Sequence, residues 1–479
     1  MNTPRDLTTM QRCITLAACL FLFMGIGRIF SLVTHSPVLG YANNYDMIRL
    51  QACHQIWPAD KFINITAGTP TAPIRRYTLE KHVDTPCFPS SELLFTSIGI
   101  ELAKLKNKVT KEELISIKTI GVVKALFLAL TILLASLFFY RHAMYSALLA
   151  NALVTVLVLS DPGVTLYLNT FYTEFSAVYF LYITLISVVT WATFQYRFIA
   201  SWVLLLGLIG LGFSKPQHLP LALSIAVLLS IYACTKRQWL NAPAMLLCAA
   251  LPLLLQMGGW YTPRNESMIR TDNINLVGSM LGIANTPDKV LTDLGLPAAC
   301  NVLAGRNGYD ATLQKTHACP EVDTLKTSTK LYALISHPAL SVRMIAQVLE
   351  QQKNWVFDMY GQVERGRNES ASYHQRTINN LLQQLPSNAI TLLPLMMALA
   401  AMVLLVAGRL QNNTFKEPHT FLLLLVVIQA SIIIGTILQG GTVGAAKSLH
   451  IYTAVSIAFV VALLLAAFFP KSYKSVTGV

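Results

Sequence analysis

Long apolar runs separated by short polar segments make up most of the chain. Runs of about 20 apolar residues, the length that crosses a bilayer, lie near residues 13–34, 119–140, 143–160, 174–196, 239–258, 387–408, 419–439 and 449–469. Residues 200–234 hold two shorter apolar runs on either side of Ser214-Lys215-Pro216-Gln217-His218, and we interpret them as two short helices. The pattern predicts an all-α polytopic membrane protein with about ten transmembrane helices.

Two long polar segments, residues 35–118 and 259–386, interrupt this pattern. We expect residues 1–258 to form a membrane domain with seven spans, in which residues 35–118 are a large first outer loop. Residues 259–386 then form a mainly helical soluble segment in the periplasm, with a break at Pro338. Residues 387–479 add three C-terminal spans.

The first outer loop contains an apolar pattern at helical spacing. Ser90 and Ser91, which can cap a helix, precede the apolar positions Leu94, Ile98, Leu102 and Leu105. A helix with this pattern either lies along the membrane surface or packs on the rest of the loop.

Composition agrees with a membrane protein. Apolar residues make up 54% of the chain and charged residues only 12%, against roughly a quarter in soluble domains. This excludes a soluble enzyme, a disordered chain and a small disulfide-rich module. The net charge of +13 does not indicate a nucleic-acid partner, because most of the basic excess lies at the ends of spans.

The distribution of Lys and Arg predicts the orientation in the membrane. In the ten-span arrangement, Lys215 and Lys447 lie on one side, and the other side holds Arg5, Arg12, Arg141, Arg197, Lys236, Arg237, Arg409, Lys416, Lys471 and Lys474. Since basic residues concentrate on the cytoplasmic side, we expect both termini in the cytoplasm. Both long polar segments then face outward, which in a bacterial inner membrane is the periplasm.

Each outer segment contains one pair of cysteines. Cys53 and Cys87 lie in the first segment, and Cys300 and Cys319 in the second. An oxidising compartment favours a disulfide within each pair, and the alternative is four buried thiols. Metal binding is less favoured because the sequence has no C-x-x-C spacing.

Three carboxylates near the outer membrane face could carry chemistry. Asp46 is the sole acidic residue in a polar run that includes Asn44, Tyr45 and Arg49. Asp161 precedes Pro-Gly, and Glu174 follows Tyr172 at the start of the fourth span. The alternative explanations are turn or cap residues for both aspartates and the favourable helix dipole for Glu174.

Cations and hydrogen-bonding groups lie at the same predicted face. Lys215, Gln217 and His218 occupy a short outer loop, and Arg28 lies inside the first span. The charged ends of Lys215 and Arg28 could instead extend to the interface between membrane and water without a further role. Together with the carboxylates, these residues would suit a sugar carried on a lipid phosphate: a carboxylate takes the acceptor proton, and cations stabilise the departing phosphate. A divalent metal, Mg²⁺ or Mn²⁺, could assist, although no metal-ligand motif is present.

In these stretches the chain resembles multi-span glycosyltransferases of the GT-C fold. More narrowly, it looks like the bacterial glycan-biosynthesis hexose transferase family. The similar segments are Asn43-Asn44-Tyr45-Asp46-Met47-Ile48-Arg49, Ser90-Ser91, Phe171-Tyr172-Thr173-Glu174, Lys215-Pro216-Gln217-His218-Leu219-Pro220, Leu294-Gly295-Leu296-Pro297 and His337-Pro338. The resemblance implies an inverting hexosyltransferase that uses a polyprenyl-phosphate sugar, with Asp46 as base and Glu174 as second acidic residue. Many GT-C enzymes have adjacent acidic residues in the first loop, whereas Tyr45 and Met47 flank Asp46.

The expected acceptor is a cell-surface glycan, lipid or protein, and a flippase and a donor synthase are expected partners. Trp260, Tyr261, Arg264 and Arg270, beyond the seventh span, could stack on sugars or belong to the core. Two other functions fit a polytopic protein of this kind. One is a transporter or flippase of lipid-linked sugars, which usually has related halves and polar residues at mid-membrane depth. The other is an O-antigen polymerase or ligase.

Overall fold

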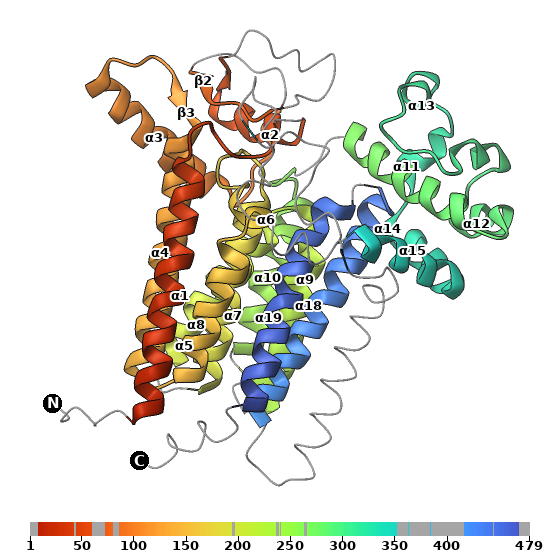
Figure 1. The fold of residues 1–479 in the computed structure, drawn as a ribbon. Coiled ribbons are helices and arrows are strands. Elements are labelled where there is room, and N and C mark those ends of the chain that lie inside the picture. Colours follow the sequence, from red (N-terminus) through yellow and green to blue (C-terminus); the bar gives the residue numbers. More distant parts are fainter. Residues whose placement is uncertain are drawn as a thin grey trace.

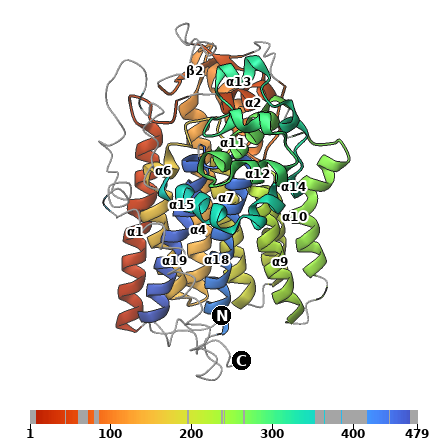
Figure 2. The same ribbon diagram turned by 90° about the vertical axis from the view of Figure 1, so that its right-hand side faces the viewer.

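The computed structural model describes residues 8–42, 45–59, 72–79, 86–193, 197–235, 241–262, 266–351, 416–443 and 445–468, together with residues 239, 363 and 384. These residues form a bundle of long helices with smaller elements gathered at one end (Figure 1). The turned view in Figure 2 shows the same division between a helical bundle and a cap.

The bundle consists of apolar helices that coincide with the predicted runs. Their bounds are α1 (Thr9–Thr34), α4 (Ile117–Arg141), α5 (Tyr145–Val154), which continues as the π-helix η1 (Thr155–Leu159), α7 (Glu174–Thr193), α8 (Arg197–Gly212), α9 (Leu219–Thr235), α10 (Asn241–Met257), α18 (Lys416–Gly440) and α19 (Ala445–Phe468). Within the described residues, five helices are long and apolar enough to cross a membrane, and four apolar helices are shorter. The chain is therefore a multi-pass membrane protein. The predicted span at 387–408 lies outside the described residues.

The ambiguous stretch 200–234 forms two helices, as predicted. Helix α8 ends at Gly212, and a short 3-10 helix η2 (Pro216–His218) leads into α9. Lys215 has extended backbone angles, φ −161° and ψ 146°, because the proline ring disfavours a helical residue before it. The polar segment Ser214–His218 therefore separates two helices that lie on different axes (Figure 1).

Small residues allow close helix contacts in the bundle, as is usual for membrane helices. Helix α7 packs against α8, and α9 packs against α10 and α18. At Gly210 an added Cβ would collide with the Phe180 ring, so a larger residue would separate α7 from α8.

The first outer loop folds into part of the cap. It contains α2 (Tyr45–His54), α3 (Leu93–Thr110) and a three-stranded antiparallel sheet in the order β1 (Trp57–Pro58), β2 (Arg76–Thr78), β3 (Ile115–Ser116). The Cys53–Cys87 disulfide joins α2 to the segment before α3. Strand β3 leads directly into α4, so the sheet is attached to the outer end of a membrane helix.

Helix α3 begins differently from the prediction. Its N-cap is Glu92, whose side chain forms no cap hydrogen bond, and the Ser90 hydroxyl accepts the Glu92 N–H at 3.1 Å instead of capping the helix interior. The predicted apolar positions, Leu94, Ile98, Leu102 and Leu105, are 36–57% exposed, while Phe95 and Ile100 are buried. The exposed apolar face suits a helix that lies on a membrane surface.

The described part of the second outer segment is helical. Its elements are α11 (Glu266–Ile283), α12 (Pro287–Leu294), η3 (Ala298–Leu303), α13 (Ala311–Thr316), η4 (Pro320–Thr324), α14 (Thr327–Ser336) and α15 (Pro338–Glu350). The predicted break lies where expected, because Pro338 ends α14 and begins α15. A disulfide joins Cys300 and Cys319. These helices lie at the same end of the bundle as α2 and β2 (Figure 2).

Candidate functional site at the outer end of the bundle

Glu174 and Lys215 form an ion pair where two membrane helices begin. Glu174 is the first residue of α7 and is completely buried, a position in which the helix dipole favours a carboxylate. Lys215 Nζ lies 3.0 Å from Glu174 Oε1, and the lysine side chain is 19% exposed. The break before Pro216 places this lysine at the junction between α8 and α9. The pair therefore has one buried member and one accessible member.

A small cavity lies beside this pair. It has a volume of about 40 Å³, room for only a few water molecules, and its lining includes Arg49, Phe88, Ser90, Thr173, Lys215 and Tyr261. These residues come from α2, the segment before α3, the start of α7, the α8–α9 junction and the end of α10. Arg49 and Lys215 thus bring two positive charges to one place, and no carboxylate lines this cavity within the described residues. The surroundings favour an anion.

His218 and Gln217 support the α8–α9 junction rather than lining the cavity. His218 Nδ1 lies 2.9 Å from the Ser214 hydroxyl, and Gln217 Nε2 lies 3.4 Å from His218 Nε2. His218 is 3% exposed and interacts electrostatically with Lys215 and Glu174. The structure therefore brings Glu174, Lys215, Gln217 and His218 of the predicted cluster together, and among these four only Lys215 lines the cavity.

A second, fully buried ion pair lies behind the first. Lys124 Nζ on α4 is 2.6 Å from Glu92 Oε1, with both side chains inaccessible to solvent. Lys124 also donates to the carbonyl oxygens of Thr170 at 2.7 Å and Tyr167 at 3.4 Å, and Glu92 Oε2 accepts the Ser176 N–H at 2.8 Å. Burial raises the pKa of the Glu92 carboxyl, and Lys124 opposes this rise. The pair fastens the start of α3 to the second outer loop.

The sequence-based prediction missed this buried pair. Lys124 lies inside the apolar run 119–140, and an ionisable residue within a span usually has a buried partner. That rule, applied to Lys124, could have found the lysine. Its partner Glu92 had no comparable signal, because it follows Ser90-Ser91 and reads as a residue of the first helical turn.

Tyr172 and Asn169 hold the first outer loop against the second. The Tyr172 hydroxyl donates to the Ala42 carbonyl at 3.2 Å. The Asn169 side-chain amide donates to the carbonyls of Val33 and Leu39 at 3.0 and 2.8 Å. Tyr172 is buried, so it positions the chain that leads to Asp46 and does not itself line the small cavity.

Aromatic rings extend this contact to the last membrane helix. The ring centroid of Tyr167 lies 4.6 Å from that of Tyr41 and 5.0 Å from that of His450 on α19. His450 also interacts electrostatically with His218. A histidine late in the chain thus joins the candidate site, although nothing in its local sequence indicated this.

Asp161 has the turn role that was the alternative to catalysis. It is the N-cap of the short helix α6 (Pro162–Thr165), and its Oδ1 accepts the Gly163 N–H at 2.9 Å. Its side chain is 1% exposed and does not line the small cavity. The prediction of Asp161 as a catalytic residue receives no support from this geometry.

The remaining predicted residues lie near the site or outside the described structure. Arg28 is half-buried on α1 and does not line the small cavity. Tyr45 and Asp46 begin α2, one helical turn before Arg49, but their side chains lie outside the described residues, as does the whole of Asn44. Arg49 also lies over the Phe88 ring, with its guanidinium carbon 6.0 Å from the ring centroid.

The structure shows the contacts of two of the predicted sugar-binding residues beyond the seventh span. Arg270 is buried and paired with Asp323 at 2.6 Å, so it stabilises the fold of the second outer segment. Tyr261 lines the small cavity and packs edge-on against Phe213 at 5.2 Å. Trp260 is 85% exposed, and Arg264 lies outside the described residues.

The described residues do not assemble a divalent metal site at this cluster. The only described group of side chains with suitable ligand spacing is Cys300, Cys319 and Glu321. Its two sulfur atoms are bonded to each other in a disulfide, so they are not available as thiolate ligands. At the candidate site, the carboxylate of Glu174 is paired with Lys215.

Comparison with known proteins identifies one family. A family model described as the YfdI N-terminal transmembrane domain matches residues 5–477. No curated protein and no solved structure matches the chain.

Proposed function

The chain belongs to the family of the YfdI N-terminal transmembrane domain, and from this premise we propose that it is a membrane glycosyltransferase of the GT-C type. It transfers a hexose from a polyprenyl-phosphate donor to a cell-surface glycan, lipid or protein. The transfer takes place at the outer face of the bacterial inner membrane, with both termini in the cytoplasm and the active site toward the periplasm.

The observation that carries the proposal is the combination of two cations and a buried carboxylate at the outer end of the bundle. Lys215 and Arg49 line one cavity, and Glu174 holds Lys215 in place through a contact of 3.0 Å. Cations fixed before the reaction stabilise a departing phosphate without reorganisation. In this proposal, Arg49 and Lys215 bind the phosphate, and Glu174 positions Lys215.

The reaction is a displacement at the anomeric carbon. The acceptor hydroxyl oxygen forms a bond to this carbon, and the bond between the carbon and the donor phosphate oxygen breaks. Asp46, one helical turn before Arg49 in α2, takes the hydroxyl proton as general base. The phosphate departs with the bonding electron pair, and the configuration at the anomeric carbon is inverted. No step is assigned to a metal ion.

The orientation in the membrane rests on the arrangement of the helix ends. The Thr9 end of α1 and the Phe468 end of α19 lie at one end of the bundle, and α2, α3 and α11 lie at the other (Figure 1). The proposed ten-span topology places the basic ends of the helices in the cytoplasm. Cysteine labelling from outside should reach a site engineered near Asn301 but not one near Arg141, both of which are exposed positions. Labelling of the Arg141 site from outside would contradict this topology.

A transfer assay tests the function directly. The purified full-length protein is incubated with a radiolabelled polyprenyl-phosphate hexose and an extract of cell-envelope acceptors, and label in the acceptor is measured. The proposal expects acceptor labelling that falls in the Lys215→Met variant but not in Lys108→Met, a lysine exposed on α3. Movement of the donor across a vesicle membrane without cleavage of the sugar–phosphate bond would instead identify a flippase.

A further inference from the structure

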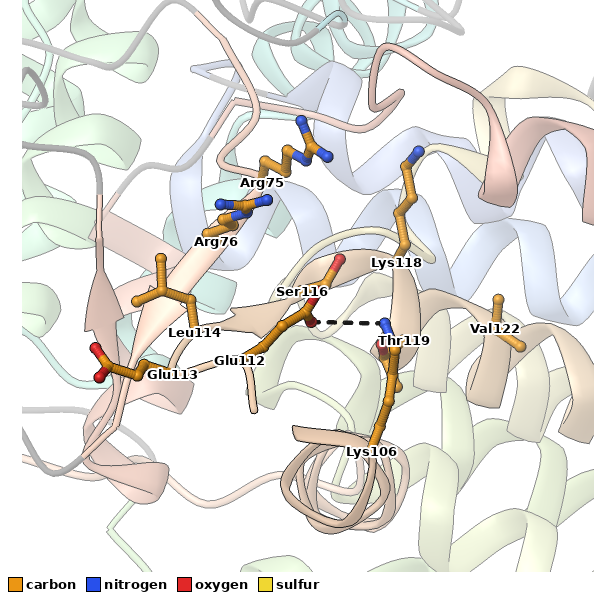
Figure 3. A pocket seen from close by; sticks show the side chains of 10 residues that line it. All are labelled: Arg75, Arg76, Lys106, Glu112, Glu113, Leu114, Ser116, Lys118, Thr119 and Val122. Atoms are coloured by element: carbon orange, nitrogen blue, oxygen red, sulfur yellow. Dashed lines mark ion pairs between the residues drawn. The ribbon is translucent and has the colours of Figure 1, made fainter. Parts of the chain in front are cut away.

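A second cavity lies at the outer end of α4, away from the Glu174–Lys215 pair. Its volume is about 620 Å³, and its charged and hydroxyl lining residues include Arg75, Arg76, Lys106, Ser116, Lys118 and Thr119. They come from strand β2 and the residue before it, strand β3, the C-terminal half of α3 and the first turn of α4 (Figure 3). None of these residues lines the small cavity, so the two cavities are separate.

The charge in this cavity is unbalanced. Four cations line it, against the two carboxylates Glu112 and Glu113. Glu112 lies 3.7 Å from Lys106, and in Figure 3 the Glu113 carboxylate points away from Arg75 and Lys118. Arg75 and Arg76 are exposed neighbours at the start of β2. The residues that line the cavity therefore carry more positive than negative charge.

The start of α4 adds to this positive potential. The N-cap Ser116 forms no side-chain cap hydrogen bond, and the first turn of this 25-residue helix contains no acidic residue. The Ile117 N–H bonds to the Arg75 carbonyl. Ser116, Lys118 and Thr119 line the cavity, so the N-terminal end of the helix, which carries a partial positive charge, borders it. A helix N-terminus joined to basic side chains is a favourable site for a phosphate.

The cavity borders the first turns of a helix that is long enough to cross a membrane. Helix α4 is long and apolar enough to cross the membrane from Ile117, and Val122, more than one turn into this helix, also lines the cavity. Lys118 Nζ contacts the Thr34 carbonyl at 3.3 Å and the Ser36 hydroxyl at 2.6 Å, at the outer end of α1. The cavity thus extends from the first turns of α4 into the cap, and its lining residue Lys118 contacts the end of α1.

We propose that this cavity binds the phosphate group of an anionic lipid head group at the outer face of the membrane. Arg75 and Arg76 contact the phosphate oxygens, for which the arginine fork is well suited. Lys118 is fixed by its bonds to Thr34 and Ser36, and it supplies a further positive charge. The binding needs no sugar donor and is independent of the proposed glycosyltransferase activity.

Native mass spectrometry of the purified full-length protein tests this site. The protein is exchanged from detergent into mixed micelles with phosphatidylglycerol and phosphatidylcholine, and the lipid that remains bound is measured. The test variant is Arg75→Gln/Arg76→Gln. The control is Lys108→Gln/Lys111→Gln, which removes the same charge from exposed positions at the end of α3 outside the cavity lining. A parallel titration with inorganic phosphate measures protection of Arg75 and Arg76 from phenylglyoxal.

The wild-type protein and the control should retain phosphatidylglycerol in preference to phosphatidylcholine. In the arginine variant this preference should be at least about tenfold weaker, since each cation near a charged membrane surface contributes measurably to the binding of anionic lipid. Protection by inorganic phosphate without lipid preference would assign the site to a dissolved phosphate compound. Equal lipid preference in the wild type and the arginine variant, with no protection by phosphate, would overturn the proposal. Because sugar transfer is not measured, this outcome would leave the glycosyltransferase proposal untouched.

Discussion

Two lysine–glutamate pairs at the cap end of the bundle have the same composition, but their lysines differ in exposure. Lys124 and Glu92 are both fully buried at 2.6 Å, and backbone carbonyl and N–H groups complete their hydrogen bonding. Lys215 and Glu174 lie 3.0 Å apart, and the lysine lines a cavity with Arg49. Lys124 has no access to solvent, and its contacts stabilise the fold. Lys215 lines a cavity, so it can also bind a ligand.

The largest effect should follow from breaking the buried pair. Lys124→Met leaves Glu92 buried without its cation, which costs about 3–5 kcal/mol for pairs of this kind. Thermal unfolding in detergent measures the change. Lys104→Met, which removes an exposed partner of Glu101, should cost no more than about 1 kcal/mol. The double variant Glu92→Gln/Lys124→Met should recover part of the loss, and equal unfolding temperatures for Lys124→Met and Lys104→Met would contradict the structural role.

The next largest effect concerns the general base. Asp46→Asn keeps the size of the side chain but cannot take a proton, so transfer should fall at least about 100-fold while the unfolding temperature stays the same. Glu174→Gln should cost less, because Glu174 only positions Lys215. An active, folded Asp46→Asn protein would show that Asp46 is a cap residue, since asparagine caps a helix about as well as aspartate.

A smaller effect on sugar transfer should distinguish the Lys215–Glu174 pair from the Lys124–Glu92 pair. Lys215→Met removes the charge beside the cavity, and transfer at subsaturating donor should fall by about tenfold, the loss expected for one charge-assisted hydrogen bond. Stability should fall as well, because Glu174 is left buried without its cation, so transfer is compared per amount of folded protein. A large loss of stability with unchanged transfer would reverse the roles assigned to the two pairs.

The smallest expected effect is a pH dependence of the stability of the cap. It arises from His54, which belongs to neither lysine–glutamate pair. Burial, and then the charge of Lys104, lowers the pKa of His54 from 6.5 to about 4, and His54 Nε2 contacts the Thr96 hydroxyl at 2.8 Å. The unfolded chain therefore binds the extra proton first, and stability should fall as the pH decreases from 6.5 toward 4. Unfolding temperatures of wild type and His54→Gln across this range test the effect, and identical pH profiles would exclude His54 as its source.

Much of the helical architecture could be predicted from the sequence because its signal is local. Apolar runs specify the membrane helices, and Pro216 and Pro338 specify breaks through the restrictions that the proline ring places on the backbone. Both cysteine pairs are bonded as expected, since each pair lies within one segment.

The candidate site was less predictable because its contacts join distant segments. The sequence indicated Arg49, Glu174 and Lys215 as site residues. It did not indicate that Arg49 and Lys215, which are 166 positions apart in the sequence, line the same cavity. Glu92 was read as part of a capped helix start, and it became a partner of Lys124 through packing of α3 on α4. Asp161 shows the converse: a local turn signal was sufficient to explain it.

The Lys124 contacts also constrain the order in which the chain assembles. Membrane helices enter the bilayer as they leave the ribosome, so Lys124 reaches the membrane before its later partners exist. Glu92 precedes Lys124 in the chain, whereas the carbonyls of Tyr167 and Thr170, which accept from Lys124, and the Ser176 N–H, which donates to Glu92, come more than 40 residues after Lys124. A nascent chain that stops before Tyr167 therefore holds this lysine and glutamate without the backbone groups that complete their hydrogen bonding. The contacts that hold Glu92 and Lys124 in place are complete only once the chain has been synthesised through Ser176.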